Sequence, residues 1–171
     1  MRTALVIVAV LLVPLPALGA AANGFGLLGG AVGHHVQTPV PRDHTSLGLA
    51  LHGDAQFVID DAWSLVPLLG LTLERLGDGL EGTASNGMAG LELRRWFGDA
   101  YLGGRLGYYV ELLAIAGTTG TYYGPGFGLT AGMEWADGWA WAVQVDRPRQ
   151  LLFSALDART TLRLVVGRRW H

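Results

Sequence analysis

Residues of the types used by hydrolytic enzymes lie next to one another at Asp43-His44-Thr45-Ser46. A serine nucleophile, a histidine base and a carboxylate that orients the histidine form a hydrolytic triad. Adjacent residues of an extended segment point to opposite sides, however, so this segment does not assemble a triad by itself. We interpret it as a turn with ordinary polar residues and assign no catalytic residue.

Three histidines in the same region, His34, His35 and His44, are the other candidates for chemistry. Their spacing is not typical of metal ligands, and a metal site there remains only an alternative. The chain contains no cysteine, which excludes disulfides, thiolate zinc sites and cysteine nucleophiles. Its glycines recur at every second position rather than in a phosphate-binding loop. We therefore expect no metal and no cofactor.

The composition indicates a membrane environment. Half of the 171 residues are apolar and only 15% are charged, with a mean hydropathy of +0.33. The 26 glycines and the many aromatic residues favour strands over helices. All 12 basic residues are arginines, set against 14 acidic residues, a balance that gives no basic field for nucleic acid.

The N-terminus has the three parts of an export signal. Arg2 provides a short basic region, residues 4–18 are apolar, and small residues follow at 19–22. The apolar stretch is short for a membrane-spanning helix and contains Pro14 and Pro16. We expect residues 1–22 to be a cleaved signal peptide and residues 23–171 to form one domain.

Beyond the signal, apolar and polar residues alternate with a period of two, which is typical of strands. In residues 101–112 the even positions are mostly large and apolar, while the odd positions include Arg105 and Glu111. Pro67 and Pro125 fall inside predicted strands, where we expect bulges. The alternation predicts eight strands, at 24–34, 46–59, 63–74, 87–97, 101–113, 122–135, 139–147 and 159–171.

The connections between these strands alternate in length. Tight turns rich in Asp and Gly occur at 60–62, 98–100 and 136–138, and longer polar connections lie between them. Up-and-down strands with short turns at one end and longer loops at the other are typical of small transmembrane barrels. The predicted fold is therefore an all-β, eight-stranded antiparallel up-and-down transmembrane β-barrel.

The apolar face meets lipid in this interpretation, and it carries large aromatic residues close to the short turns or the C-terminus. We interpret these residues as an aromatic girdle at one membrane interface: Trp63, Phe97, Trp135, Trp139 and Trp170.

The opposite face points into the lumen and carries charges of both signs. Buried charges must pair, and a barrel of eight strands is only just wide enough for its own side chains. We expect a network of ion pairs that fills the lumen, with a narrow pore as the alternative. Its members are Asp54, Glu74, Glu92, Arg94, Arg105, Glu111, Glu134, Asp146, Arg163 and Arg169.

Four arginines interrupt the lipid-facing side. Arg95 and Arg168 lie near the short turns, whereas Arg75 and Arg147 lie where strands enter the longer loops. A guanidinium suits the phosphate groups of lipids well. Arg75 and Arg147 are therefore possible contacts for lipid phosphates.

This strand pattern resembles the OmpA/OmpX-type family of eight-stranded outer-membrane barrels, over residues 24–171. The last strand, residues 160–171, looks like the signal by which the assembly machinery recognises the members of this family, although it ends in His171 rather than in an aromatic residue. The resemblance implies a monomer in the bacterial outer membrane that contacts outer-membrane lipids and lipopolysaccharide. It makes the phosphates of lipid A the possible partners of Arg75 and Arg147. It implies a non-enzymatic role in envelope integrity or in surface interaction through the loops. The alternatives are a lipid A-modifying hydrolase or acyltransferase, or a small porin-like channel.

Overall fold

The computed structural model describes residues 23–37, 44–77, 82–115, 117–148 and 158–171. Eight strands account for nearly all of them. Their bounds are β1 Gly24–Gln37, β2 His44–Val58, β3 Trp63–Leu76, β4 Gly82–Phe97, β5 Ala100–Ile115, β6 Thr118–Glu134, β7 Trp139–Pro148 and β8 Ala158–Trp170. Within these ranges, no helix is long and apolar enough to cross a membrane.

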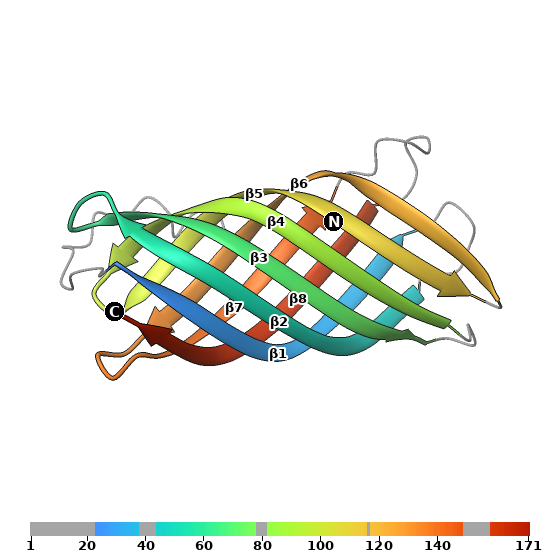
Figure 1. The fold of residues 1–171 in the computed structure, drawn as a ribbon, viewed down its shortest axis with the longest axis horizontal. Coiled ribbons are helices and arrows are strands. Elements are labelled where there is room, and N and C mark those ends of the chain that lie inside the picture. Colours follow the sequence, from blue (N-terminus) through green and yellow to red (C-terminus); the bar gives the residue numbers. More distant parts are fainter. Residues whose placement is uncertain (1–22, 38–43, 78–81, 116, 149–157) are drawn as a thin grey trace, which may run out of the picture.

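The strands form one closed barrel in chain order (Figure 1). Each strand pairs antiparallel with the next, and β8 closes the barrel by pairing antiparallel with β1. The three short turns and the C-terminus lie at one end of the barrel, which we call the short-turn end; the opposite end is the long-loop end. The predicted fold class is confirmed.

Several strands extend further than predicted at the long-loop end. The strand predicted from residue 87 begins at Gly82, and the one predicted from residue 122 begins at Thr118. The added segments are rich in Thr, Ser, Gly and Asn on both faces. Because they lack apolar alternation, the pattern that marks a strand is missing there although the backbone pairing continues.

Side chains alternate between the lumen and the outer surface. Along β3, for example, Leu69, Leu71 and Leu73 are exposed while Thr72 and Glu74 are buried. The sequence left the facing of the first strand open. In the structure Leu28 and Val32 of β1 point inward, whereas Phe25 and Leu27 are exposed.

Local hydrogen bonds and glycines build the short turns. Asp60 accepts hydrogen bonds through Oδ1 from the backbone amides of Ala62 and Trp63, at 2.8 and 2.9 Å. Gly98 and Gly138 adopt φ values of 69° and 85°, which favour glycine. These turns hold the girdle residues at the ends of their strands.

The bulges expected at Pro67 and Pro125 are absent. The pairing of β2 with β3 is interrupted opposite Pro67 but resumes in the same register, so neither strand has an extra residue. Pro125 keeps its register with Tyr108 of β5 and lies just beyond the segment of β6 that pairs with β7. A short gap in the ladder, or the end of a paired segment, accommodates each missing amide donor.

Candidate functional site: the barrel lumen

The structure places all ten predicted lumen charges inside the barrel, each at most 8% exposed. The inward-facing positions of seven strands supply them. Eight of the ten form one connected network, and Glu74 and Glu111 lie closer to the long-loop end. The network is described below from the short-turn end towards the long-loop end.

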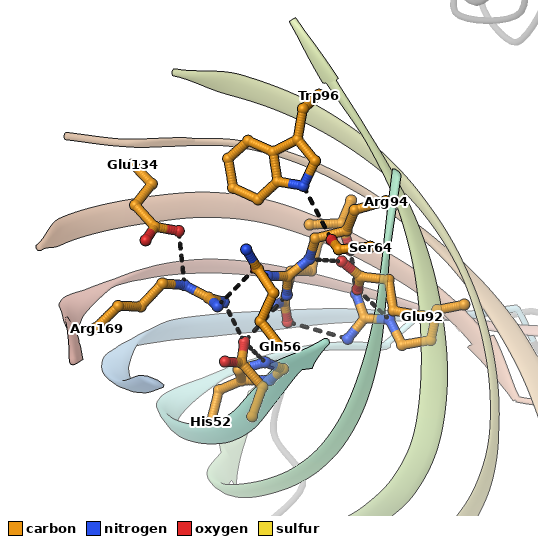
Figure 2. Close-up of polar contacts among 12 residues, drawn as sticks. His52, Gln56, Ser64, Glu92, Arg94, Trp96, Glu134 and Arg169 are labelled. Atoms are coloured by element: carbon orange, nitrogen blue, oxygen red, sulfur yellow. Dashed lines mark hydrogen bonds and ion pairs between the residues drawn. The ribbon is translucent and has the colours of Figure 1, made fainter. Parts of the chain in front are cut away.

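Asp54 on β2 is the centre of the first part of the network. Figure 2 shows the surrounding side chains, among them His52, Gln56, Arg94 and Arg169. Asp54 Oδ2 accepts hydrogen bonds from Arg94 Nη2, at 3.0 Å, and from Arg169 Nη2. His52 Nε2 lies 3.3 Å from the same oxygen. Gln56 Oε1 accepts from both guanidiniums, at 3.3 Å from Arg94 and 3.0 Å from Arg169. Two cations therefore share one carboxylate and one amide.

Arg169 also ties this centre to the short-turn end. Its Nε lies 3.0 Å from Glu134 Oε2, and His171 Nε2 lies 2.7 Å from Glu134 Oε1. Glu134 is the last residue of β6, so this link joins the last strand to the start of a short turn.

Glu92 links Arg94 to the next arginine. Its Oε1 accepts a hydrogen bond from Arg94 Nε at 2.5 Å, and its Oε2 lies 3.6 Å from Arg105 Nε. Thr130 donates a hydrogen bond to Glu92 at 2.9 Å and accepts one from Arg105 at 2.6 Å. The hydroxyl therefore bridges this ion pair.

Asp146 on β7 completes the network. Its Oδ1 lies 3.4 Å from Arg105 Nε and accepts a hydrogen bond from Tyr109 at 3.0 Å. Its Oδ2 accepts a hydrogen bond from Arg163 of β8. The signs thus alternate along a chain of four carboxylates and four guanidiniums, in the order Glu134, Arg169, Asp54, Arg94, Glu92, Arg105, Asp146 and Arg163.

Aromatic side chains inside the lumen pack against this network. The ring of Tyr101 lies 4.5 Å from the Arg94 guanidinium carbon and 4.9 Å from the ring of Trp96. Trp96 Nε1 donates a hydrogen bond to Ser64 Oγ at 2.9 Å. These aromatic residues are not among the predicted lumen residues, although Trp96 has the same parity as Glu92 and Arg94 on β4.

A second polar cluster lies towards the long-loop end, around Glu74. Ser46 donates a hydrogen bond to Glu74 Oε2 at 2.6 Å, and Thr72 donates one to Oε1 at 2.8 Å. Asn86 Nδ2 donates to the same Oε1 at 3.0 Å. The hydroxyl of Ser46, the serine of the possible triad, is thus buried in the lumen and bound to a carboxylate.

The remaining candidates for chemistry lie outside what the structure describes. Asp43 and the side chains of His34, His35 and His44 are not among the described groups. Among the groups that are described, no three His, Asp or Glu side chains are placed to hold a metal ion.

No protein-family model and no characterised protein matches the sequence. Solved structures of similar fold, however, match the barrel, and three of them are described here. Ail of Yersinia pestis, in complex with the heparin analogue sucrose octasulfate, matches with a TM-score of 0.65 and 10% identity over 88% of this chain and 100% of its own. Neisserial surface protein A matches with a TM-score of 0.58 and 11% identity over 85% and 97% of the two chains. OprG of Pseudomonas aeruginosa matches with a TM-score of 0.53 and 12% identity over 90% and 98%.

The chain has the fold of the small outer-membrane barrels. In this fold the exposed apolar side chains of the outer surface form the band that meets lipid.

The five girdle residues lie on this outer surface. Trp135, Trp139 and Trp170 are 43%, 49% and 42% exposed, and Trp170 stacks on Phe25 with ring centroids 5.2 Å apart. Trp63 and Phe97 are half-buried on either side of Arg95. Trp63, Phe97, Trp139 and Trp170 lie at strand ends at the short-turn end, and Trp135 directly follows β6 there.

Arg75 and Arg147 are exposed on the outer surface near the long-loop end. In the register, Arg75 lies opposite Leu47 and Arg147 lies opposite Phe127. Both guanidiniums thus project beside apolar side chains of the lipid-facing band.

Proposed function

We propose that this protein is a non-enzymatic barrel of the bacterial outer membrane that supports envelope integrity or interacts with partners through its longer loops. The observation that carries the proposal is the alternating network of four carboxylates and four guanidiniums across the lumen. Such a network favours a rigid, closed scaffold. The fold and the apolar outer surface support the outer-membrane location.

The lumen network argues against the alternative of a small porin-like channel. Every charge in it lies within 4 Å of one of the opposite sign. An ion that crossed the barrel would have to separate buried pairs, and breaking one such pair costs about 3–5 kcal/mol.

The environment of Ser46 argues against a lipid A-modifying enzyme. Its hydroxyl is buried inside the barrel and donates to Glu74. Lipid A, by contrast, would approach from the membrane or from the cell surface.

Surface interaction is supported by the lengths of the connections at the long-loop end, of which residues 38–43, 77–81 and 149–157 are longer than the short turns, whereas the connection predicted at 114–121 is reduced to residues 116–117. A rigid barrel carrying longer connections at one end presents them as recognition elements. Ail, the attachment invasion locus protein of Yersinia pestis, has a similar fold, and its structure contains a heparin analogue. Since similar folds carry different functions, the partner of these loops has to be identified by experiment.

We further propose that residues 1–22 are removed on export, that the assembly machinery inserts the barrel through β8, and that the barrel is a monomer. N-terminal sequencing of the purified protein should begin at Ala21 or Asn23. An N-terminus at Met1 in the outer-membrane fraction would contradict the cleavage.

A deletion strain tests the proposed function. We expect sensitivity to detergent to increase without any change in lipid A acylation, and the intact gene to restore resistance. A strain that binds host cells or polyanions less well, with normal detergent resistance, would favour surface interaction. A changed lipid A mass spectrum that the gene restores would contradict the non-enzymatic role.

A further inference from the structure

An apolar groove with a volume of about 480 Å³ lies on the outer surface over β3, β4 and β5. Its walls are leucines, Leu65, Leu91, Leu93 and Leu106, which are 38% to 72% exposed. The groove lies in the lipid-facing band, so an apolar occupant suits it.

Three glycines, Gly90, Gly104 and Gly107, line the groove with the leucines, and of these Gly104 stands at an outward position of β5. The next outward residues along this strand, Leu102 and Leu106, are both large. A Cβ at Gly104 would meet no atom within 4 Å. The glycine is thus not required by close packing, and its effect is to leave the space open.

The cationic side chain of Arg95 lies beside the end of the groove nearest the short turns. Arg95 lies two residues after Leu93 on β4, a distance of about 6.8 Å along the strand. In the register, the row Trp63, Arg95 and Leu102 adjoins the row Leu65, Leu93 and Gly104. The charge therefore lies directly beside the groove, at the level of the aromatic girdle.

Two aromatic rings hold the Arg95 guanidinium. Its carbon lies 5.6 Å from the Trp63 ring centroid and 5.3 Å from that of Phe97, within cation–π range. No carboxylate among the described residues pairs with Arg95. A guanidinium that is fixed in place and lacks a carboxylate partner is suited to bind a phosphate.

We propose that this surface binds one glycerophospholipid of the periplasmic leaflet. The phosphate contacts Arg95 at the interface, and one acyl chain lies in the groove between the leucines. The proposal rests on the membrane placement argued above. It commits to a lipid with a phosphate and acyl chains, because the groove is apolar and its end carries a positive charge.

Arg168 provides a matched control for Arg95. Both arginines point outward near the short-turn end, and each lies opposite a girdle tryptophan in the register, Trp63 for Arg95 and Trp139 for Arg168. Only Arg95 adjoins the groove.

The test is native mass spectrometry of the folded, purified barrel in detergent. The probes are dioleoyl phosphatidylglycerol, dioleoyl phosphatidylethanolamine and the uncharged dioleoylglycerol. We expect the wild type to retain one phospholipid of either kind and to retain dioleoylglycerol roughly tenfold less. Glycerol 3-phosphate, which has the phosphate without the chains, should not displace the bound lipid.

Single substitutions test the headgroup contact and the groove independently. Arg95→Gln and Gly104→Leu should each lower phospholipid retention roughly tenfold, while Arg168→Gln should leave it unchanged. Equal losses in Arg95→Gln and Arg168→Gln, or full retention in Gly104→Leu, would overturn the proposal. So would a dimer that Gly104→Leu abolishes, since a second copy of the chain would then fill the groove.

Heat-modifiable migration on a gel identifies folded barrels before each measurement. If Arg95→Gln fails to fold, the lipid selectivity of the wild type and the lipid retention of Gly104→Leu still test the proposal. Lipid retention in detergent is independent of the deletion phenotype. Failure of this inference can therefore be told apart from failure of the proposed function.

Discussion

Arg169 of β8 pairs with Asp54 of β2 across the intervening strand β1. Gly26 of β1 lies opposite both residues in the register. A Cβ at Gly26 would lie 2.8 Å from Asp54 Oδ1 and 3.0 Å from Arg169 Cγ. The ion pair therefore crosses Gly26, where the Cβ of any other residue would lie against both side chains. Gly26 lies where the first strand pairs with the last.

Loss of this pair should destabilise the barrel. In Arg169→Ala, Asp54 and Glu134 each lose a buried cation, so we expect the free energy of unfolding to fall by about 3–5 kcal/mol. Urea unfolding in lipid vesicles, followed by tryptophan fluorescence, measures the change. The neighbouring outward residue provides the control, and Arg168→Ala should change stability by less than about 1 kcal/mol. Equal effects of the two substitutions would contradict a special role for the pair.

A larger side chain at position 26 should also destabilise the barrel. Gly26→Val places a branched side chain between Asp54 and Arg169, and overpacking of this kind typically costs about 1–3 kcal/mol. Gly104→Val, which enters open space on the outer surface, is the matched substitution and should leave stability within about 1 kcal/mol of the wild type. The same unfolding assay compares the two. A fully stable Gly26→Val barrel would show that the pair can move aside.

The lumen should not conduct. Purified barrel in planar bilayers should give no stable single-channel steps, because the ion pairs join strands on all sides of the lumen. Reproducible current steps from the wild-type protein would refute the closed lumen.

Loss of Arg105 should destabilise the barrel. Arg105→Ala removes the cation between Glu92 and Asp146, so we expect the free energy of unfolding to fall, again by about 3–5 kcal/mol.

The short-turn end should face the periplasm. The chain has no native cysteine, so Asp61→Cys and Gly82→Cys each introduce a single thiol. In intact cells an impermeant maleimide should label only Gly82→Cys, which lies at the long-loop end. Labelling of both thiols after the outer membrane is broken is the control. The reverse pattern in intact cells would invert the topology.

Arg75 and Arg147 should anchor lipopolysaccharide at the long-loop end. We expect lipopolysaccharide to raise the thermal unfolding temperature of the wild type more than that of the double variant Arg75→Gln, Arg147→Gln. The reason is that each guanidinium can bind a lipid A phosphate. A thermal melt with and without lipopolysaccharide measures both shifts. Equal stabilisation of the two proteins would mean that the arginines merely extend to the interface.

The period-two alternation and the alternating lengths of the connections were enough to predict the barrel, and parity was enough to predict the inward direction of its charges. Strand residues alternate between two faces, so Glu92 and Arg94 had to share the face opposite Leu91 and Leu93. The partners of each charge could not be predicted in this way. Asp54 meets Arg169 only because β8 returns to β1, and that closure depends on the register of the whole barrel.

The groove on the outer surface could not be predicted from the sequence for the same reason. The sequence places Gly104 on the lipid-facing side, but a hollow forms only when large residues on the neighbouring strands stand around it. Leu65 and Leu93 become its walls through pairing across β3, β4 and β5. The strand ends near Gly82 were missed for a different reason, since polar residues on both faces leave no periodicity to detect.

Two of the four guanidiniums in the lumen network, those of Arg163 and Arg169, belong to β8. The preceding seven strands supply all four carboxylates but only Arg94 and Arg105. Within this network, β1–β7 alone would thus hold an excess of two negative charges, which Arg163 and Arg169 neutralise when the last strand pairs. Closing the barrel and balancing the charge of the network are then a single step. A chain that stopped before this step would keep unpaired carboxylates inside an open sheet, and because unpaired charge is costly in hydrocarbon, we expect insertion and completion of the sheet to be coupled.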